Sequence, residues 1–351
     1  MRTLYKAFLF VFISGLFASC EVEFSPNDTW REIPVVYCLL DQDDDTSYVR
    51  VQRCFLGEGN QYQFASVGDS INYPQGALTV FIEEWNAQMD ANGNVVRSGA
   101  SPRRVLPFDY TEVINKEEGL FYNTVQPLYV CATAGTLDSS YIYVLKVIKN
   151  STGDTIAKSE TRLVYGDMQL IKPNNVNIFR FSGVAGSKVC EISWTALEEA
   201  RQYQPVVRFF YRQFMVNYNV VPADTTIVRH YIDIPCNAVK SNMRDRSFST
   251  KLEQNFFLSE IKRNIVDSTS NKNIIDTVQI FVNCCGEPLA AYIYAGSPAG
   301  SLTQDPFVYT NIEGGLGVFA ARRCHISFLA KTPASGADNY VRAIKELNIG
   351  F

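Results

Sequence analysis

Histidine is scarce in this chain of 351 residues, which contains only His230 and His325. Imidazole is the side chain most often used as a general base near neutral pH and is a frequent zinc ligand, so two histidines leave little capacity for either role. The sequence also lacks a C-x-x-C pair, a G-x-S-x-G elbow, an H-E-x-x-H motif, a P-loop and a dinucleotide-binding glycine pattern. We therefore expect no catalytic residues, no metal site and no cofactor.

An excess of basic residues is also missing. The chain has 32 Lys and Arg against 36 Asp and Glu, a formal net charge of -4. A protein that binds a polyphosphate backbone needs the opposite balance, so nucleic acid is excluded as an expected partner.

Long apolar runs are absent after the N-terminus. Arg2 and Lys6 precede an apolar run from Ala7 to Ala18, which is the order of a secretory signal. The run is too short to span a membrane, for which a helix needs roughly 20 apolar residues. We expect residues 1–19 to be a cleaved signal peptide.

The residues at the expected cleavage point indicate a lipid anchor. Phe17-Ala18-Ser19-Cys20 resembles the lipobox of bacterial lipoproteins, with Phe17 in place of the usual leucine. Cys20 is the predicted lipidation site, and residues 20–32 are predicted to form the lipidated N-terminus and tether. Two or three acyl chains hold such a protein firmly, since each buried methylene contributes roughly 0.8 kcal/mol. The expected location is the outer membrane, on its cell-surface or periplasmic face.

Eight further cysteines follow the anchor. Their even number permits disulfides outside the cytoplasm. Several lie in apolar strand patterns such as residues 35–40, where a free thiol behaves as a small hydrophobe. We expect mostly free core thiols, with one or two bridges left open.

Alternating apolar and polar residues predict strands in the first half, for example at 48–55, 78–83 and 141–149. A polar, proline-bearing stretch at 163–175 is typical of an interdomain connection. The sequence thus predicts a mainly β protein with two antiparallel β-sandwich domains, 33–168 and 169–351, of immunoglobulin or fibronectin type III character. Residues 189–221 resemble the start of a fibronectin type III sandwich.

A few helical additions are expected in the second domain. Apolar residues share one face at 250–265, and Thr250 and Glu253 have capping-box spacing. Shorter helices are expected at 287–295 and 340–347.

Two segments carry a family resemblance, residues 33–40 and residues 309–319, which read IPVVYCLL and YTNIEGGLGVF. Together with Cys20 they resemble the domain of unknown function 4249 family of Bacteroidota lipoproteins, over nearly the whole mature chain. The resemblance implies an envelope lipoprotein, often encoded beside TonB-dependent outer-membrane transporters, and it supplies no catalytic residues.

The second segment is the candidate for ligand binding. Its glycines would let the backbone approach a ligand, while polar side chains offer stacking and hydrogen bonds; the residues are Tyr309, Asn311, Glu313, Gly314, Gly315 and Gly317. The favoured alternative is a tight turn between strands. A phosphate cradle would need a following helix, whereas residues 318–322 have a strand pattern.

Two groups of acids complete the candidates. Residues 41–45 hold four aspartates, but positions six and twelve of an EF-hand would be Thr46 and Gln52, so a solvated hairpin tip is favoured over calcium. The adjacent glutamates at 83–84, 117–118 and 198–199 are interpreted as solvated surface charge rather than a glycosidase pair.

The sequence therefore favours a noncatalytic envelope lipoprotein on a lipid anchor, accessory to a TonB-dependent outer-membrane barrel through ligand capture or docking. An adhesin or fimbria-like structural lipoprotein is the alternative, and an envelope hydrolase is less favoured.

Overall fold

The computed structural model describes residues 32–54, 61–114, 122, 124–173, 179–184, 186–217, 224–242, 244–265, 271–297, 308–328 and 339–347. The predicted signal peptide, the lipidation site at Cys20 and almost all of the tether lie outside these residues. Within them the protein is mainly β, which confirms the predicted fold class.

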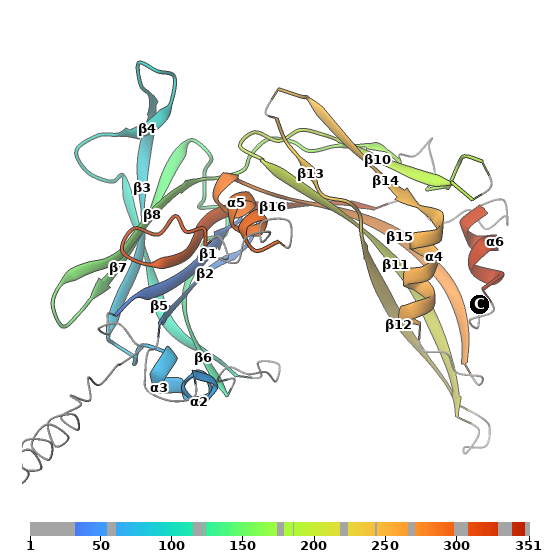
Figure 1. Cartoon of the computed structure of the whole chain (residues 1–351), viewed down its shortest axis with the longest axis horizontal. Helices are drawn as coiled ribbons and strands as arrows, with labels where there is room; N and C mark the ends of the chain where they lie inside the picture. The colour runs from blue at the N-terminus through green and yellow to red at the C-terminus, as the bar shows by residue number, and fades with distance from the viewer. Residues whose placement is uncertain are drawn as a thin grey trace, which may run out of the picture.

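The elements form two lobes (Figure 1). The first lobe contains β1 (Pro34–Leu40), β2 (Thr46–Arg53), α2 (Gln61–Ala65), α3 (Gly68–Ile71), β3 (Leu78–Met89), β4 (Val95–Ser98), β5 (Arg104–Ile114), β6 (Val125–Ala132), β7 (Tyr141–Lys149) and β8 (Asp154–Arg162). The second contains β9 (Leu170–Lys172), β10 (Val189–Thr195), β11 (Gln202–Asn217), β12 (Asp224–Pro235), β13 (Val239–Lys240), β14 (Ser247–Glu253), α4 (Gln254–Asn264), β15 (Asn271–Cys285) and α6 (Asn339–Lys345). Helix α5 (Glu287–Ala295) and strand β16 (Leu316–Phe328) lie at the junction.

One sheet runs through both lobes. Its strand order is β12-β11-β15-β16-β1-β2-β6-β5-β3-β7-β8, with β13 paired to β11 and β4 to β3. A separate three-stranded sheet, β14-β10-β9, lies in the second lobe. The division into two sandwich domains is therefore not confirmed.

Strand β16 joins the lobes because its two halves have different partners. Residues 316–321 pair with β1, and residues 322–328 pair with β15. The pairing with β1 is parallel, so the expectation of purely antiparallel sheets is wrong at this point and the sheet is mixed. The expected boundary at 168/169 also differs from the structure in one respect, since the chain returns to the first lobe after residue 308.

The first lobe is a sheet that curls back on itself. Residues 104–108 of β5 pair with β3, and residues 109–114 pair with β6, so β5 turns the corner. Backbone hydrogen bonds between Lys158 and Glu313, 3.0 and 2.7 Å long, connect β8 to the segment that precedes β16. The predicted alternation is observed, with Val36, Cys38 and Leu40 buried on one face of β1.

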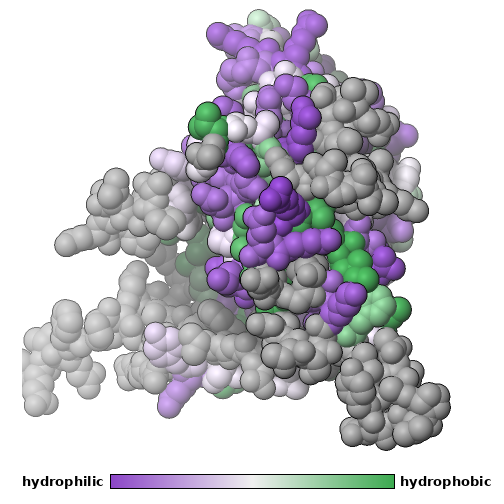
Figure 2. Space-filling view, turned by 90° about the vertical axis from the view of Figure 1, so that its right-hand side faces the viewer, coloured by the Kyte–Doolittle hydropathy of each residue, from purple (hydrophilic) through white to green (hydrophobic). Residues whose placement is uncertain are grey.

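The core of the second lobe is aromatic. Phe257 of α4 is buried among Phe179, Phe181 and Phe209, with ring centroids 5.2 to 6.0 Å from its own. The outer surface on this side, which carries α4 and α6, is mainly hydrophilic where it is coloured in Figure 2. Aromatic burial therefore fixes α4 against the sheets.

The helices at 287–295 and near the C-terminus are confirmed by α5 and α6, but the predicted helix at 250–265 begins late. Thr250 lies in β14, where it pairs with Ile192, and the helix starts at Gln254. Glu253 is the N-cap residue and makes no side-chain capping bond, so the predicted capping box is wrong. Pairing with β10 outweighs the local helical signal.

All eight cysteines that the structure describes are free, as expected, and five of them are buried: Cys38, Cys190, Cys236, Cys284 and Cys285. Among the described residues, no helix has both the length and the apolar character needed to cross a bilayer.

Candidate functional site

The two motif segments meet in space. Strand β1 comes from the first, and β16 begins inside the second, with Val36 opposite Gly317. Each segment therefore supplies one strand of the same parallel pairing.

Asn311 has a structural role. Its Nδ2 donates a hydrogen bond to the Phe319 carbonyl (2.7 Å), and its Oδ1 accepts one from the Phe319 amide (3.0 Å). The Asn311 carbonyl in turn accepts a bond from the Ser159 hydroxyl (2.7 Å). The side-chain amide thus fixes the turn onto β16, and the backbone carbonyl of Asn311 fixes it onto β8.

The glycines of this segment also face the chain itself. A Cβ atom would lie 2.7 Å from the Ile156 carbonyl oxygen at Gly314, 2.5 Å from that of Pro34 at Gly315, and 2.0 Å from that of Val36 at Gly317. These contacts support the alternative of a structural turn, because the close approach is to neighbouring strands.

Tyr309 and Glu313 are the two remaining ligand-binding candidates of this segment. Burial raises the pKa of the half-buried Tyr309, and the Glu313 side chain is 80% exposed, with one oxygen 3.9 Å from Lys158 Nζ. Neither lines the pocket described below. Ligand binding by residues 309–319 stays a prediction.

The aspartate loop between β1 and β2 is not simply solvated, which corrects the interpretation from sequence. Asp41 is only 4% exposed, and burial raises its pKa. Arg322 Nη2 lies 2.9 Å from Asp44 Oδ2, and Arg323 Nε lies 2.8 Å from Asp43 Oδ2. The loop is thus fastened to β16, and the described residues contain no group of three or more metal-binding side chains placed to hold an ion.

The interpretation of Glu83 and Glu84 as surface charge is also wrong. Glu84 has no exposed surface; it accepts from Arg103, from Arg104 Nη2 at 2.5 Å, and from the Tyr143 hydroxyl at 3.4 Å. Two guanidinium groups compensate the cost of burying one carboxylate. This cluster links β3, β5 and β7 and lies apart from the pocket.

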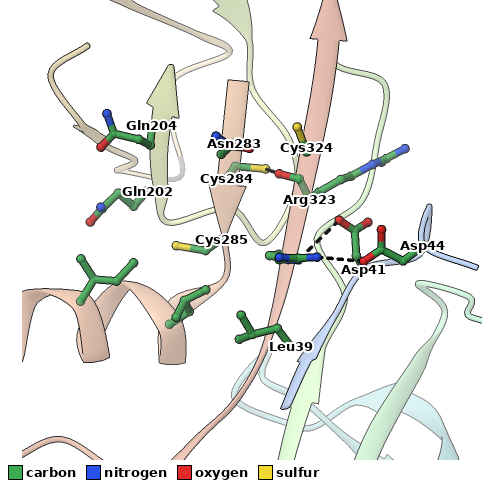
Figure 3. A pocket seen from close by; sticks show the side chains of 13 residues that line it. Leu39, Asp41, Asp44, Gln202, Gln204, Asn283, Cys284, Cys285, Arg323 and Cys324 are labelled. Atoms are coloured by element: carbon green, nitrogen blue, oxygen red, sulfur yellow. Dashed lines mark hydrogen bonds and ion pairs between the residues drawn. The ribbon is translucent and has the colours of Figure 1, made fainter. Parts of the chain in front are cut away.

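A pocket of about 380 Å³ lies where β16 changes partners, between the ends of β1, β11 and β15 and the helix α5 (Figure 3). Its lining residues come from five segments: Leu39, Asp41, Asp44, Gln202, Gln204, Asn283, Cys284, Cys285, Leu289, Ile293, Arg322, Arg323 and Cys324. This volume is within the range of about 300–1,000 Å³ that small-ligand sites occupy.

The pocket has an apolar side and a charged side. Leu39 and two residues of α5, Leu289 and Ile293, supply the apolar side, while Asp41 and Asp44 pair with Arg322 on the charged side. The side-chain amides of Gln202, Gln204 and Asn283 lie above the apolar side in Figure 3.

The thiols of the pocket are held neutral. Burial raises the pKa of Cys284 to about 12 and that of Cys285 to about 11, and it also raises the pKa of Cys324. The Cys284 thiol lies 3.3 Å from the Arg323 carbonyl oxygen as a hydrogen-bond donor. Nucleophilic catalysis requires the thiolate, so these cysteines fit packing better than covalent chemistry.

The geometry is suited to binding. Neither histidine lines the pocket, and each of its arginines is already paired with carboxylates. Sequence reasoning missed this site. The one signal that could have pointed to it is the alternation of two glutamines, Gln202 and Gln204, with the buried Tyr203. No local sequence pattern predicts that β16 pairs first with β1 and then with β15.

No model of a known protein family matches the chain, and no curated protein matches it. The resemblance to the domain of unknown function 4249 family stays an expectation that rests on the motif residues.

Proposed function

We propose that the protein is a noncatalytic, lipid-anchored envelope protein that captures a small ligand for an outer-membrane transporter of the TonB-dependent class. The observation that carries this proposal is the pocket at the junction of the lobes, whose charges are paired and whose thiols are neutral. The lipobox at Cys20 supports the membrane location.

The first experiment is a mild crosslink and affinity purification from outer membranes. It compares the tagged protein with Cys20→Ala, which removes the anchor, and with Leu289→Asp, which places a charge in the pocket. We expect a transporter barrel with the lipidated form and its loss with Cys20→Ala. Leu289→Asp tests whether the pocket itself contacts the barrel, because the barrel should still be recovered if docking uses another surface. Met89→Asp, at a residue of the first lobe that is 76% exposed, is the matched control. Recovery of the lipidated protein alone would contradict the proposal.

A structural, adhesin-like role is the second candidate, because β12 is the end strand of the large sheet. An end strand offers unpaired backbone groups to a neighbouring subunit. The same crosslink would then give ladders of the protein itself in place of a barrel.

A hydrolase is the third candidate, because Asp41 and Asp44 both line the pocket. Asp41 has a raised pKa, as a general acid requires, but both carboxylates face Arg322, which neutralises charge there. Turnover of a glycan or peptide that is lost in Asp44→Asn would favour this role over capture.

A further inference from the structure

We propose that the ligand is a short peptide segment without acidic side chains, which places an aliphatic side chain against Leu39, Leu289 and Ile293 and backbone amides against Gln202 and Asn283. This inference rests on the proposed function, since it names the class of ligand that the pocket would capture.

The apolar contact is argued from α5. The helix reads EPLAAYIYA, and none of its residues is fully buried, although most are apolar. Ile293 is 45% exposed and Tyr294 is 49% exposed. Leu289 and Ile293 are one helical turn apart, and both line the pocket together with Leu39. An aliphatic side chain placed there would remove exposed apolar surface from water.

The polar contact is argued from three side-chain amides. Within the described residues, the amides of Gln202 and Asn283 make no hydrogen bond, and Gln204 uses its Nε2 to donate to the Cys236 carbonyl, which leaves its Oε1 as an acceptor. A side-chain amide carries a donor and an acceptor in one plane, which is the complement of a peptide group. Gln202 and Asn283 can thus each pair with a peptide backbone in the way that an adjacent strand does.

Charge argues against an anionic ligand. Arg322 and Arg323 are the cations that line the pocket, and they already face Asp41, Asp44 and Asp43. An anion would have to displace these carboxylates or leave them beside a like charge, and both cost free energy.

The absence of aromatic side chains from the pocket lining argues against a sugar as the ligand. None of the thirteen lining residues is aromatic. The C–H face of a sugar ring binds best on the negative face of an aromatic ring, which this pocket does not supply. A peptide needs no such ring, because aliphatic contacts and amides suffice.

The test measures binding to the detergent-solubilised full chain by fluorescence anisotropy. The probe is a labelled tetrapeptide of alanine and leucine with both ends blocked. Unlabelled competitors are the same peptide, a version with two aspartates, and a neutral glucose oligosaccharide. We expect competition by the neutral peptide alone.

Four variants localise the binding. Gln202→Ala and Leu289→Asp should weaken probe binding about tenfold or more, as loss of a central contact typically does. Gln88→Ala and Met89→Asp, at exposed positions of β3, should change it less than about twofold, as peripheral contacts do. Gln202 is only half-buried and its side chain makes no hydrogen bond to another described residue, so Gln202→Ala keeps the test decisive if Leu289→Asp lowers the unfolding midpoint.

Three results would overturn the inference: no binding of the peptide, better competition by the oligosaccharide or the acidic peptide, or equal binding by all four variants. These results are separable from failure of the proposed function. A barrel recovered by crosslinking without peptide binding removes only the ligand class, whereas peptide binding without a barrel removes only the transporter role.

Discussion

At the scale of single residues, Gly317 combines two constraints. Its φ is +107°, a conformation that side chains with a Cβ rarely adopt, and a Cβ there would lie 2.0 Å from the Val36 carbonyl oxygen. The parallel pairing of β1 and β16 brings the two backbones this close.

We predict that Gly317→Ala lowers the free energy of unfolding by about 3 kcal/mol, of which about 1–2 kcal/mol comes from the backbone conformation and the rest from the clash. Gly153→Ala is the matched control, because Gly153 also has a positive φ (+75°) but open space around it. It should cost only about 1 kcal/mol. Urea unfolding measures both, and equal losses would remove the steric part of the argument.

Glu84 is the second residue with a measurable contribution. We predict that Glu84→Gln lowers the free energy of unfolding by about 2 kcal/mol, because two arginines lose a buried, charged acceptor. Glu160→Gln is the control: its pair with Arg97 is 3.0 Å long, but the Glu160 side chain is 57% exposed. That variant should lose less than about 0.5 kcal/mol, as exposed ion pairs do. A loss in the Glu84 variant no larger than in the control would show that Arg103 and Arg104 are satisfied by solvent.

At the scale of elements, α4 begins where β14 ends, and its N-terminus has no side-chain cap. We predict that Glu253→Ser stabilises the protein by about 0.5–1 kcal/mol, because a serine oxygen at the N-cap can accept from a free amide of the first turn. Thr250→Ser serves as the control, since Thr250 lies in β14, where it pairs with Ile192 of β10, and cannot cap the helix. Thermal unfolding measures both. If residue 250 rather than residue 253 capped the helix, Glu253→Ser would not be the more stable of the two variants, and this result would contradict the prediction.

At the scale of the whole molecule, the shared strand predicts one cooperative unit. Residues 316–321 of β16 belong to the first lobe and residues 322–328 to the second, so neither lobe can unfold without exposing the edge of the other. Arg323 strengthens this link, because its Nη1 donates to the Gly166 carbonyl (2.6 Å) while its Nε pairs with Asp43.

We predict that amides of β7 and β11, one strand from each lobe, lose hydrogen-exchange protection at the same urea concentration. Exchange measured by mass spectrometry at rising urea tests this, with the short strand β4 as an internal control that should open earlier because it pairs with β3 alone. Complete exchange of one lobe while the other stays protected would mean that the lobes are independent domains.

The sequence by itself determined the local elements. The period of two marked the strands of the first lobe, because this pattern depends on residues adjacent in the chain. The short helices α5 and α6 also lie where the sequence predicts them. The burial of most cysteines also followed from their apolar neighbours. The start of α4 could not be obtained in this way, since Thr250 is held in β14 by residues about sixty positions earlier.

Only the tertiary structure decided the junction and its pocket. The parallel pairing of residues 35–40 with 316–321, the burial of Glu84 and the fastening of the aspartate loop by Arg322 and Arg323 all join segments that are distant in sequence. A pattern of hydrophobicity records which face of a strand is buried but not which strand lies beside it. The pocket exists because β16 leaves one partner for another, and that exchange is a property of the assembled sheet.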